Sequence, residues 1–95
     1  MTDLDQFDFV KWDEIPNPAM RSGLEIYLTT GRIPGNFLQA LLSNNLIDAF
    51  ARADPTNLDL LQQWCWWMHG EFPSTAWGSR DKMLAWSKER QAKNA

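Results

Sequence analysis

The chain has 95 residues, of which 44% are hydrophobic, and it carries a net charge of −3 at pH 7. This length fits one domain with a modest core, and the composition is that of an ordinary globular protein. The weak charge excludes both a strongly basic nucleic-acid binder and a dense acidic mimic of DNA. Because no apolar run approaches the ~18 residues of a membrane span and the N-terminus is acidic, we expect neither a membrane segment nor a secretion signal. Cys65 has no second cysteine to pair with, so we expect a reducing, cytoplasmic setting.

Residues 1–16 form an acidic arm that also carries aromatic side chains. Five carboxylates and one lysine lie within its first 14 residues, whereas the last 16 residues carry an excess of three positive charges. Two solvated ends would explain this pattern. Alternatively, Phe7, Phe9 and Trp12 anchor the arm on a basic surface of its own chain, of a second copy or of another protein.

Cap residues divide residues 17–95 into about four helices. In chain order, the expected helices run from the Asn17-Pro18 cap to Gly31, from Asn36 to Ala53, from the Asp54-Pro55 cap to Gly70, and from Ser79 onward. No alternating pattern is long enough to predict a strand. We therefore expect an all-α fold: one compact domain of about four short helices, with a mobile or docked acidic N-terminal arm.

Apolar residues at helical spacing predict the core. On the apolar faces of the second and third predicted helices we expect four leucines to be buried: Leu42, Leu46, Leu58 and Leu61. In the third helix Trp64, Cys65 and Met68 fall within roughly 60° of Leu61, which makes them core positions too. Trp67 lies at the flank beside Leu60.

Trp66 differs from its neighbours because it projects about 140° away from Leu61 onto the polar face. Its neighbours there are Asp59, Gln62 and Gln63. An indole in water forgoes ~2 kcal/mol relative to burial, and tryptophan is enriched among residues that dominate binding. We therefore assign these four residues to a candidate partner-binding surface, together with the aromatic residues Trp12 and Phe9 of the arm. The alternatives are that the arm or the loop of residues 71–79 covers Trp66, or that a second copy does.

No constellation of residues predicts catalysis. His69 is the only histidine, and Cys65 four residues before it would give a metal ion two ligands at most. We expect no catalytic residue, no metal site, no cofactor and no enzymatic activity. Asn45 is expected partly buried in mid-helix, where its amide needs partners. It hydrogen-bonds the backbone of an adjoining loop or, beside Arg52, forms an alternative ligand-binding site.

Several short motifs together resemble a group of small proteins encoded by tailed bacteriophages and prophages. The motifs are Gly31-x-Ile33-Pro34-Gly35-x-Phe37-Leu38, Asn44-Asn45-Leu46, Ala51-Arg52-Ala53-Asp54-x-x-Asn57, Pro73, and Trp77-Gly78-Ser79 with Trp86. The resemblance covers about residues 21–87. It implies expression in an infected bacterial cytoplasm and supplies no catalytic residues. The chain departs from the group's pattern at Asn45, where aspartate is frequent, and in the density of tryptophan over residues 64–67.

The leading hypothesis is a non-enzymatic, phage-type protein that binds and modulates a host macromolecule, for example by inhibiting a defence system. One alternative is a small-molecule or nucleotide binder, with indoles stacking on a base and Arg21, Arg32 or Arg52 meeting phosphate. Another is a structural homo-oligomer. Nucleic acid is disfavoured because no basic groove is predicted. A pocket near Asn45 and Arg52 would favour a ligand, whereas an exposed apolar patch around Trp66 would favour a macromolecule.

Overall fold

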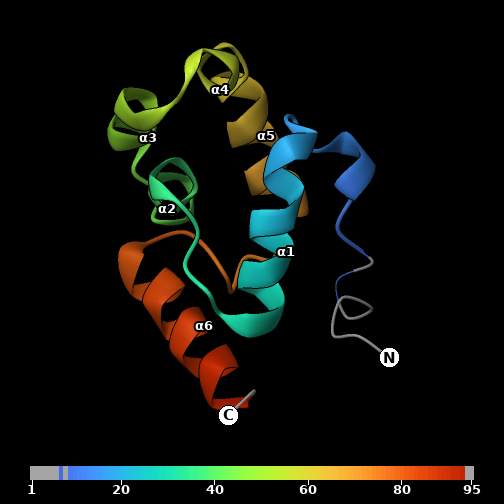
Figure 1. Cartoon of the computed structure of the whole chain (residues 1–95), viewed down its shortest axis with the longest axis vertical. Helices are drawn as coiled ribbons and strands as arrows, with labels where there is room; N and C mark the ends of the chain where they lie inside the picture. The colour runs from blue at the N-terminus through green and yellow to red at the C-terminus, as the bar shows by residue number, and fades with distance from the viewer. Residues whose placement is uncertain (1–6, 8, 94–95) are drawn as a thin grey trace.

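Helices account for most of the chain, as its cap residues predicted (Figure 1). The computed structural model describes residues 7 and 9–93, and among these it contains no strand. Short connections link the helices, which are α1 (Arg21–Thr30), α2 (Asn36–Leu42), α3 (Leu46–Arg52), α4 (Pro55–Asp59), α5 (Leu61–Glu71) and α6 (Arg80–Lys93). The all-α fold is confirmed, but two of the predicted helices are each divided in two.

The first predicted helix has the expected ends. The side chain of Asn17 accepts a hydrogen bond from the backbone N–H of Ala19 at 3.1 Å, and a short 3-10 helix, η3 (Pro18–Met20), leads into α1. Gly31 ends α1 with a φ of 81°, in the left-handed region that glycine adopts readily. A Cβ at this position would collide with the backbone carbonyl of Ser87 in α6, so Gly31 also allows α1 and α6 to approach closely.

The second predicted helix breaks at residues 43–45, which overturns the expectation of one continuous helix. Asn44 has a φ of 58°, a left-handed conformation that asparagine tolerates better than most residues. Asn45 then caps α3, because its side-chain oxygen accepts from the backbone N–H of Asp48 at 3.1 Å. This break turns α3 relative to α2. Leu42 is fully buried as predicted, whereas Leu46 is 52% exposed, so its assignment to the core was wrong.

The third predicted helix begins where expected but is interrupted at Leu60. The side chain of Asp54 accepts from the backbone N–H of Asn57 at 2.8 Å, and Pro55 opens α4. Because α4 is one short turn with its own direction, Leu58 is 40% exposed and its core assignment was wrong; Leu61 is partly buried. Gly70 does not end α5, which continues through Glu71.

The last predicted helix is confirmed by its cap. The Ser79 hydroxyl accepts from the backbone N–H of Lys82 at 3.1 Å and starts α6. α6 then lies alongside α1 in the lower half of Figure 1, while α3 and α4 lie at the top. The indole of Trp86 donates to the carbonyl of Tyr27 at 3.3 Å, which ties the two helices together.

The core is built around an aromatic chain that runs through α5. Trp64 is fully buried, and its ring meets those of Phe37 and Trp67 edge-on, with centroids 5.9 Å apart in both pairs. Met68 is buried as predicted, while Cys65 is only half-buried rather than a core residue. The Cα radius of gyration is 12.6 Å, close to the roughly 12 Å expected of a compact domain of this size.

The described part of the arm docks on its own chain. Its buried side chains include Phe7 and Trp12. The ring of Trp12 lies 5.8 Å from that of Trp67 and the ring of Phe7 lies 6.1 Å from that of Trp86. A 3-10 helix, η2 (Trp12–Glu14), brings the arm across α5. Arginines cover two of these rings: Arg21 lies 5.4 Å from the centroid of Trp12, and the guanidinium of Arg90 lies 5.4 Å from the ring of Phe7. The acidic residues Asp3, Asp5 and Asp8 lie outside the described residues.

Candidate functional site

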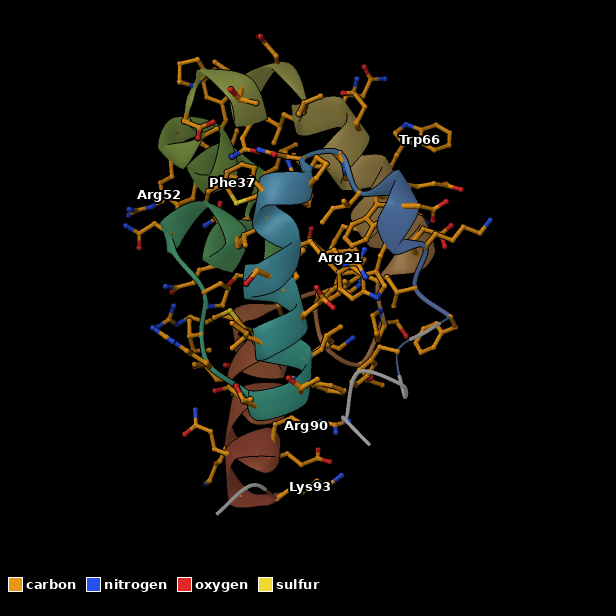
Figure 2. The ribbon with its side chains drawn as sticks, turned by 45° about the vertical axis from the view of Figure 1, so that its right-hand side comes forward. Arg21, Phe37, Arg52, Trp66, Arg90 and Lys93 are labelled. Carbon is orange, nitrogen blue, oxygen red and sulfur yellow. The ribbon has the colours of Figure 1, made fainter. Side chains whose placement is uncertain are left out.

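Trp66 projects from α5 into solvent, on the polar face to which helical geometry assigned it. Its side chain is 76% exposed, and Figure 2 shows it at the upper right, pointing away from the body of the protein. Neither the described part of the arm nor the loop after α5 covers it. Beside it runs an open groove of about 770 Å³ between α5 and the arm, which we call the Trp66 groove. The groove is lined by Glu14, Pro16, Leu60, Gln62, Gln63, Trp66, Trp67, Gly70 and Glu71.

The groove brings together three of the six residues assigned to the partner-binding surface, namely Trp66, Gln62 and Gln63. Asp59 is exposed on α4 but does not line the groove. Trp12 is buried, so its assignment to an exposed binding surface was wrong: its indole donates to the carbonyl of Phe7 at 3.3 Å. Phe9 is exposed, with its ring 6.4 Å from that of Phe7 and outside the groove lining.

The groove combines an apolar floor with acidic edges. Trp67 is buried beneath it, held by a hydrogen bond of 3.1 Å from its indole to the carbonyl of Lys11. Among the lining residues, the charged ones are Glu14 from the arm and Glu71 from the end of α5, and none is basic. Neither carboxylate was predicted from the sequence: Glu14 reaches the groove only because the arm packs beside α5, and Glu71 lies beyond Gly70, where the predicted helix ended.

The break in the second predicted helix creates a further apolar surface on α3. Leu46, Ile47 and Phe50 are 52%, 80% and 58% exposed. We call these three residues the α3 face. Next to it lies an apolar pocket of about 250 Å³, whose lining includes Leu41, Leu46, Cys65, Met68, His69 and Trp77. One sequence signal could have revealed this face: Asn45 followed three residues later by Asp48 resembles the start of a new helix.

Asn45 and Arg52, the alternative ligand-binding pair, do line one shallow polar pocket of about 250 Å³. Both are already engaged by their own helix. Asn45 caps α3, and Arg52 pairs with the carboxylate of Asp48 at 3.0 Å. Asn45 is exposed at a helix start rather than partly buried in mid-helix, so that expectation was wrong. In Figure 2 Arg52 and Trp66 project on opposite sides of the protein, so their surfaces are separate.

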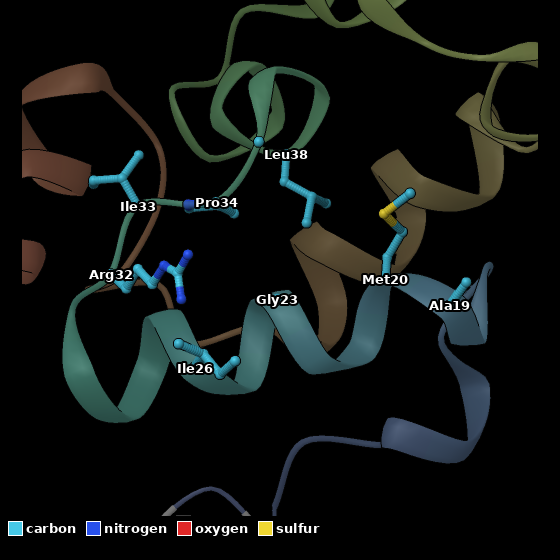
Figure 3. Close-up of a pocket in the computed structure, with 9 residues that line it drawn as sticks. Ala19, Met20, Gly23, Ile26, Arg32, Ile33, Pro34 and Leu38 are labelled. Carbon is cyan, nitrogen blue, oxygen red and sulfur yellow. The ribbon is translucent and has the colours of Figure 1, made fainter.

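Another pocket, of about 380 Å³, lies between α1 and the connection to α2 (Figure 3). Its lining is mostly apolar, including Met20, Ile26 and Leu38, and the charged group that lines it is Arg32. Figure 3 shows Arg32 on the connecting segment, opposite Gly23 and Ile26 of α1. The absence of a side chain at Gly23 leaves this space open.

Cys65 and His69 both line the apolar pocket beside the α3 face. The His69 ring stands nearly perpendicular to that of Trp77, with centroids 6.5 Å apart. Within residues 7 and 9–93, no three side chains of the His, Cys, Asp or Glu types are grouped so that they could hold a metal ion. In the same part of the chain, no helix is both long and apolar enough to span a bilayer.

Comparison with known proteins does not assign this chain to a family. Comparison of the chain with family models, with curated proteins and with solved structures found no match. The exposed side chains and grooves described above therefore provide the basis for inferring its function.

Proposed function

We propose that this chain is a non-enzymatic interaction protein that binds another macromolecule through the Trp66 groove. The observation that carries the proposal is the 76% exposure of Trp66 beside an open groove floored by Trp67. A large ring left in water loses the free energy that burial would provide, and a partner can restore it. Tryptophans in such positions are enriched among the residues that dominate binding energy.

The groove suits a macromolecule better than a small ligand. It is an open groove of about 770 Å³ between the arm and α5, whereas small ligands are usually bound in enclosed cavities. Because its motifs resemble those of phage-encoded proteins, we propose as partner a host protein of the bacterial cytoplasm, whose activity the chain modulates. Inhibition of a defence system is one such activity.

Affinity capture tests this proposal. The tagged chain and its Trp66→Ala variant would be expressed in bacterial cells, and captured proteins would be identified by mass spectrometry. Leu84→Ala is the matched control, because Leu84 is also an exposed apolar side chain but lies on α6. We expect Trp66→Ala to lose a partner that both the unmodified chain and Leu84→Ala retain, with unchanged melting temperatures. Retention of every partner by Trp66→Ala would overturn the proposal.

Self-association is a second candidate function, favoured by the α3 face. Three neighbouring apolar side chains exposed on one short helix are a common basis for an interface. If a second copy covers this face, the molecular mass measured by light scattering will be that of an oligomer, and Ile47→Ser with Phe50→Ser will return it to the monomer value. A monomer at all concentrations would remove this candidate.

A further inference from the structure

The Trp66 groove presents an aromatic face together with negative charge. Glu14 stands on the arm side of the groove and Glu71 at the end of α5, and Gln62 and Gln63 of the first turn of α5 also line it. None of the lining side chains is cationic. A partner that enters the groove therefore meets two carboxylates and, among the described lining residues, no basic group.

We infer that the occupant of the Trp66 groove is a cationic segment of a partner polypeptide, bearing arginine or lysine. This inference rests on the proposed function and specifies the chemistry of the partner. The cation lies over the indole of Trp66, where the negative face of the ring attracts it, and within reach of the carboxylate of Glu71 or Glu14. The amides of Gln62 and Gln63 are placed to bind the backbone of the same segment.

The same chemistry already occurs elsewhere in the chain. The guanidinium of Arg21 lies 5.4 Å from the ring centroid of Trp12, and that of Arg90 lies 4.4 Å from the ring centroid of Trp86. Among the described residues, no arginine or lysine stacks in this way on Trp66. Trp66 is thus an exposed ring that shares its groove with two carboxylates, and no cation from the described part of the chain stacks on it.

Other occupants fit the groove less well. An acidic peptide or a nucleic acid would bring negative charge against Glu14 and Glu71, and like charges at close range oppose association. A purely apolar helix is better matched by the α3 face, where the exposed side chains are Leu46, Ile47 and Phe50. The basic end of a second copy would satisfy the charge but would make the protein oligomeric through Trp66.

Peptide titration tests the inference directly. The probe is a short acetylated and amidated peptide that alternates arginine with alanine and leucine. Its matched control replaces each arginine by citrulline, which keeps the shape and removes the charge. Binding is followed by nuclear magnetic resonance through the indole N–H signal of Trp66, assigned with the Trp66→Phe variant, and through the side-chain amide signals of Gln62 and Gln63.

We expect the arginine peptide to shift the Trp66 signal and to bind more tightly than the citrulline peptide by about two- to fivefold per cation that stacks. Glu71→Gln and Glu14→Gln should each lower the affinity for the arginine peptide and leave the affinity for the citrulline peptide unchanged. Asp59→Asn is the matched control for charge, because Asp59 is an exposed carboxylate outside the groove, and it should leave binding unaltered. Added salt should lower the affinity for the arginine peptide, since it screens the attraction between solvent-exposed charges.

Three results would overturn the inference: equal affinity for the two peptides, tighter binding of a glutamate-containing peptide, or an oligomer that Trp66→Ala dissociates. The proposed function is judged separately. If a captured partner depends on Trp66 while none of the peptides shifts its signal, the groove binds a macromolecule but not a cationic segment. If neither capture nor titration depends on Trp66, both fail.

Discussion

The indole of Trp64 donates a buried hydrogen bond to the side-chain oxygen of Asn57, 3.0 Å away. The same oxygen accepts from the side-chain amide of Asn17, also at 3.0 Å. This one acceptor therefore joins α5, α4 and the cap of η3 at the point where they meet. Because Asn57 and Trp64 are both excluded from solvent, water cannot replace the bond if it is lost.

Asn57→Ala should destabilise the protein strongly for its size. The substitution leaves the indole N–H of Trp64 without an acceptor, which costs about 1–3 kcal/mol, and removes packing around it. Urea unfolding measures the loss as a lower midpoint. Gln63→Ala, an exposed amide on α5, is the control and should unfold like the unmodified chain. Equal midpoints for the two variants would show that the bond contributes nothing.

The tryptophans of α5 should divide into structural and surface residues. Trp64→Ala removes a fully buried ring and should lower the free energy of unfolding by about 3–5 kcal/mol. Trp66→Ala removes an exposed ring and should change it by less than about 0.5 kcal/mol. Thermal melts of the two variants check this. If Trp66→Ala unfolds as readily as Trp64→Ala, the ring of Trp66 is packed and the proposed surface does not exist.

Leu42 and Leu46 should respond differently to truncation although they lie four residues apart. Leu42→Ala creates a cavity in the core and should cost about 2–5 kcal/mol. Leu46→Ala lies beyond the break at Asn44 and should cost less than about 1 kcal/mol, because its side chain is half exposed. Denaturant midpoints for the pair provide the measurement. Comparable losses would mean that α2 and α3 form one helix with a common buried stripe.

The arm should contribute to stability. Deleting residues 1–14 removes the buried side chains of Phe7 and Trp12, and with them the contacts to Trp86 and Trp67. We expect a lower melting temperature, and Phe7→Ala should reproduce part of the loss. Phe9→Ala is the matched control because Phe9 is exposed. An unchanged melting temperature on deletion would show that the arm does not hold the domain together.

Stability should fall at alkaline pH because of Tyr27. Burial raises the pKa of this hydroxyl above its ordinary value of 10.0, and the group donates to the carbonyl of Ala76 at 2.7 Å. Below pH 10 the hydroxyl is protonated in both folded and unfolded chains. Above it the unfolded chain releases the proton first, so unfolding becomes easier as pH rises. The free energy of unfolding, measured by urea denaturation above pH 10, should decline more steeply with pH for the unmodified chain than for Tyr27→Phe; parallel curves would contradict this.

Local signals within the sequence determined the helical fold and several of its helix boundaries. Asn17, Asp54 and Ser79 start helices where their side chains accept backbone N–H groups, and Gly31 ends one with a positive φ. Such caps act within one helical turn, so they can be identified without knowing the rest of the structure. Its angle around one helix likewise assigned Trp66 to the polar face, whereas only the tertiary structure showed that its ring is left exposed.

Only the tertiary structure decided which residues surround Trp66 and which leucines are buried. Glu14 reaches the groove because Trp12 packs on Trp67, a contact between residues far apart in the chain. Leu46 and Leu58 lie outside the core, contrary to the prediction, because the chain changes direction at the breaks at Asn44 and Leu60. Helical periodicity places side chains relative to one axis, and where the axis turns, packing between helices determines which face is buried.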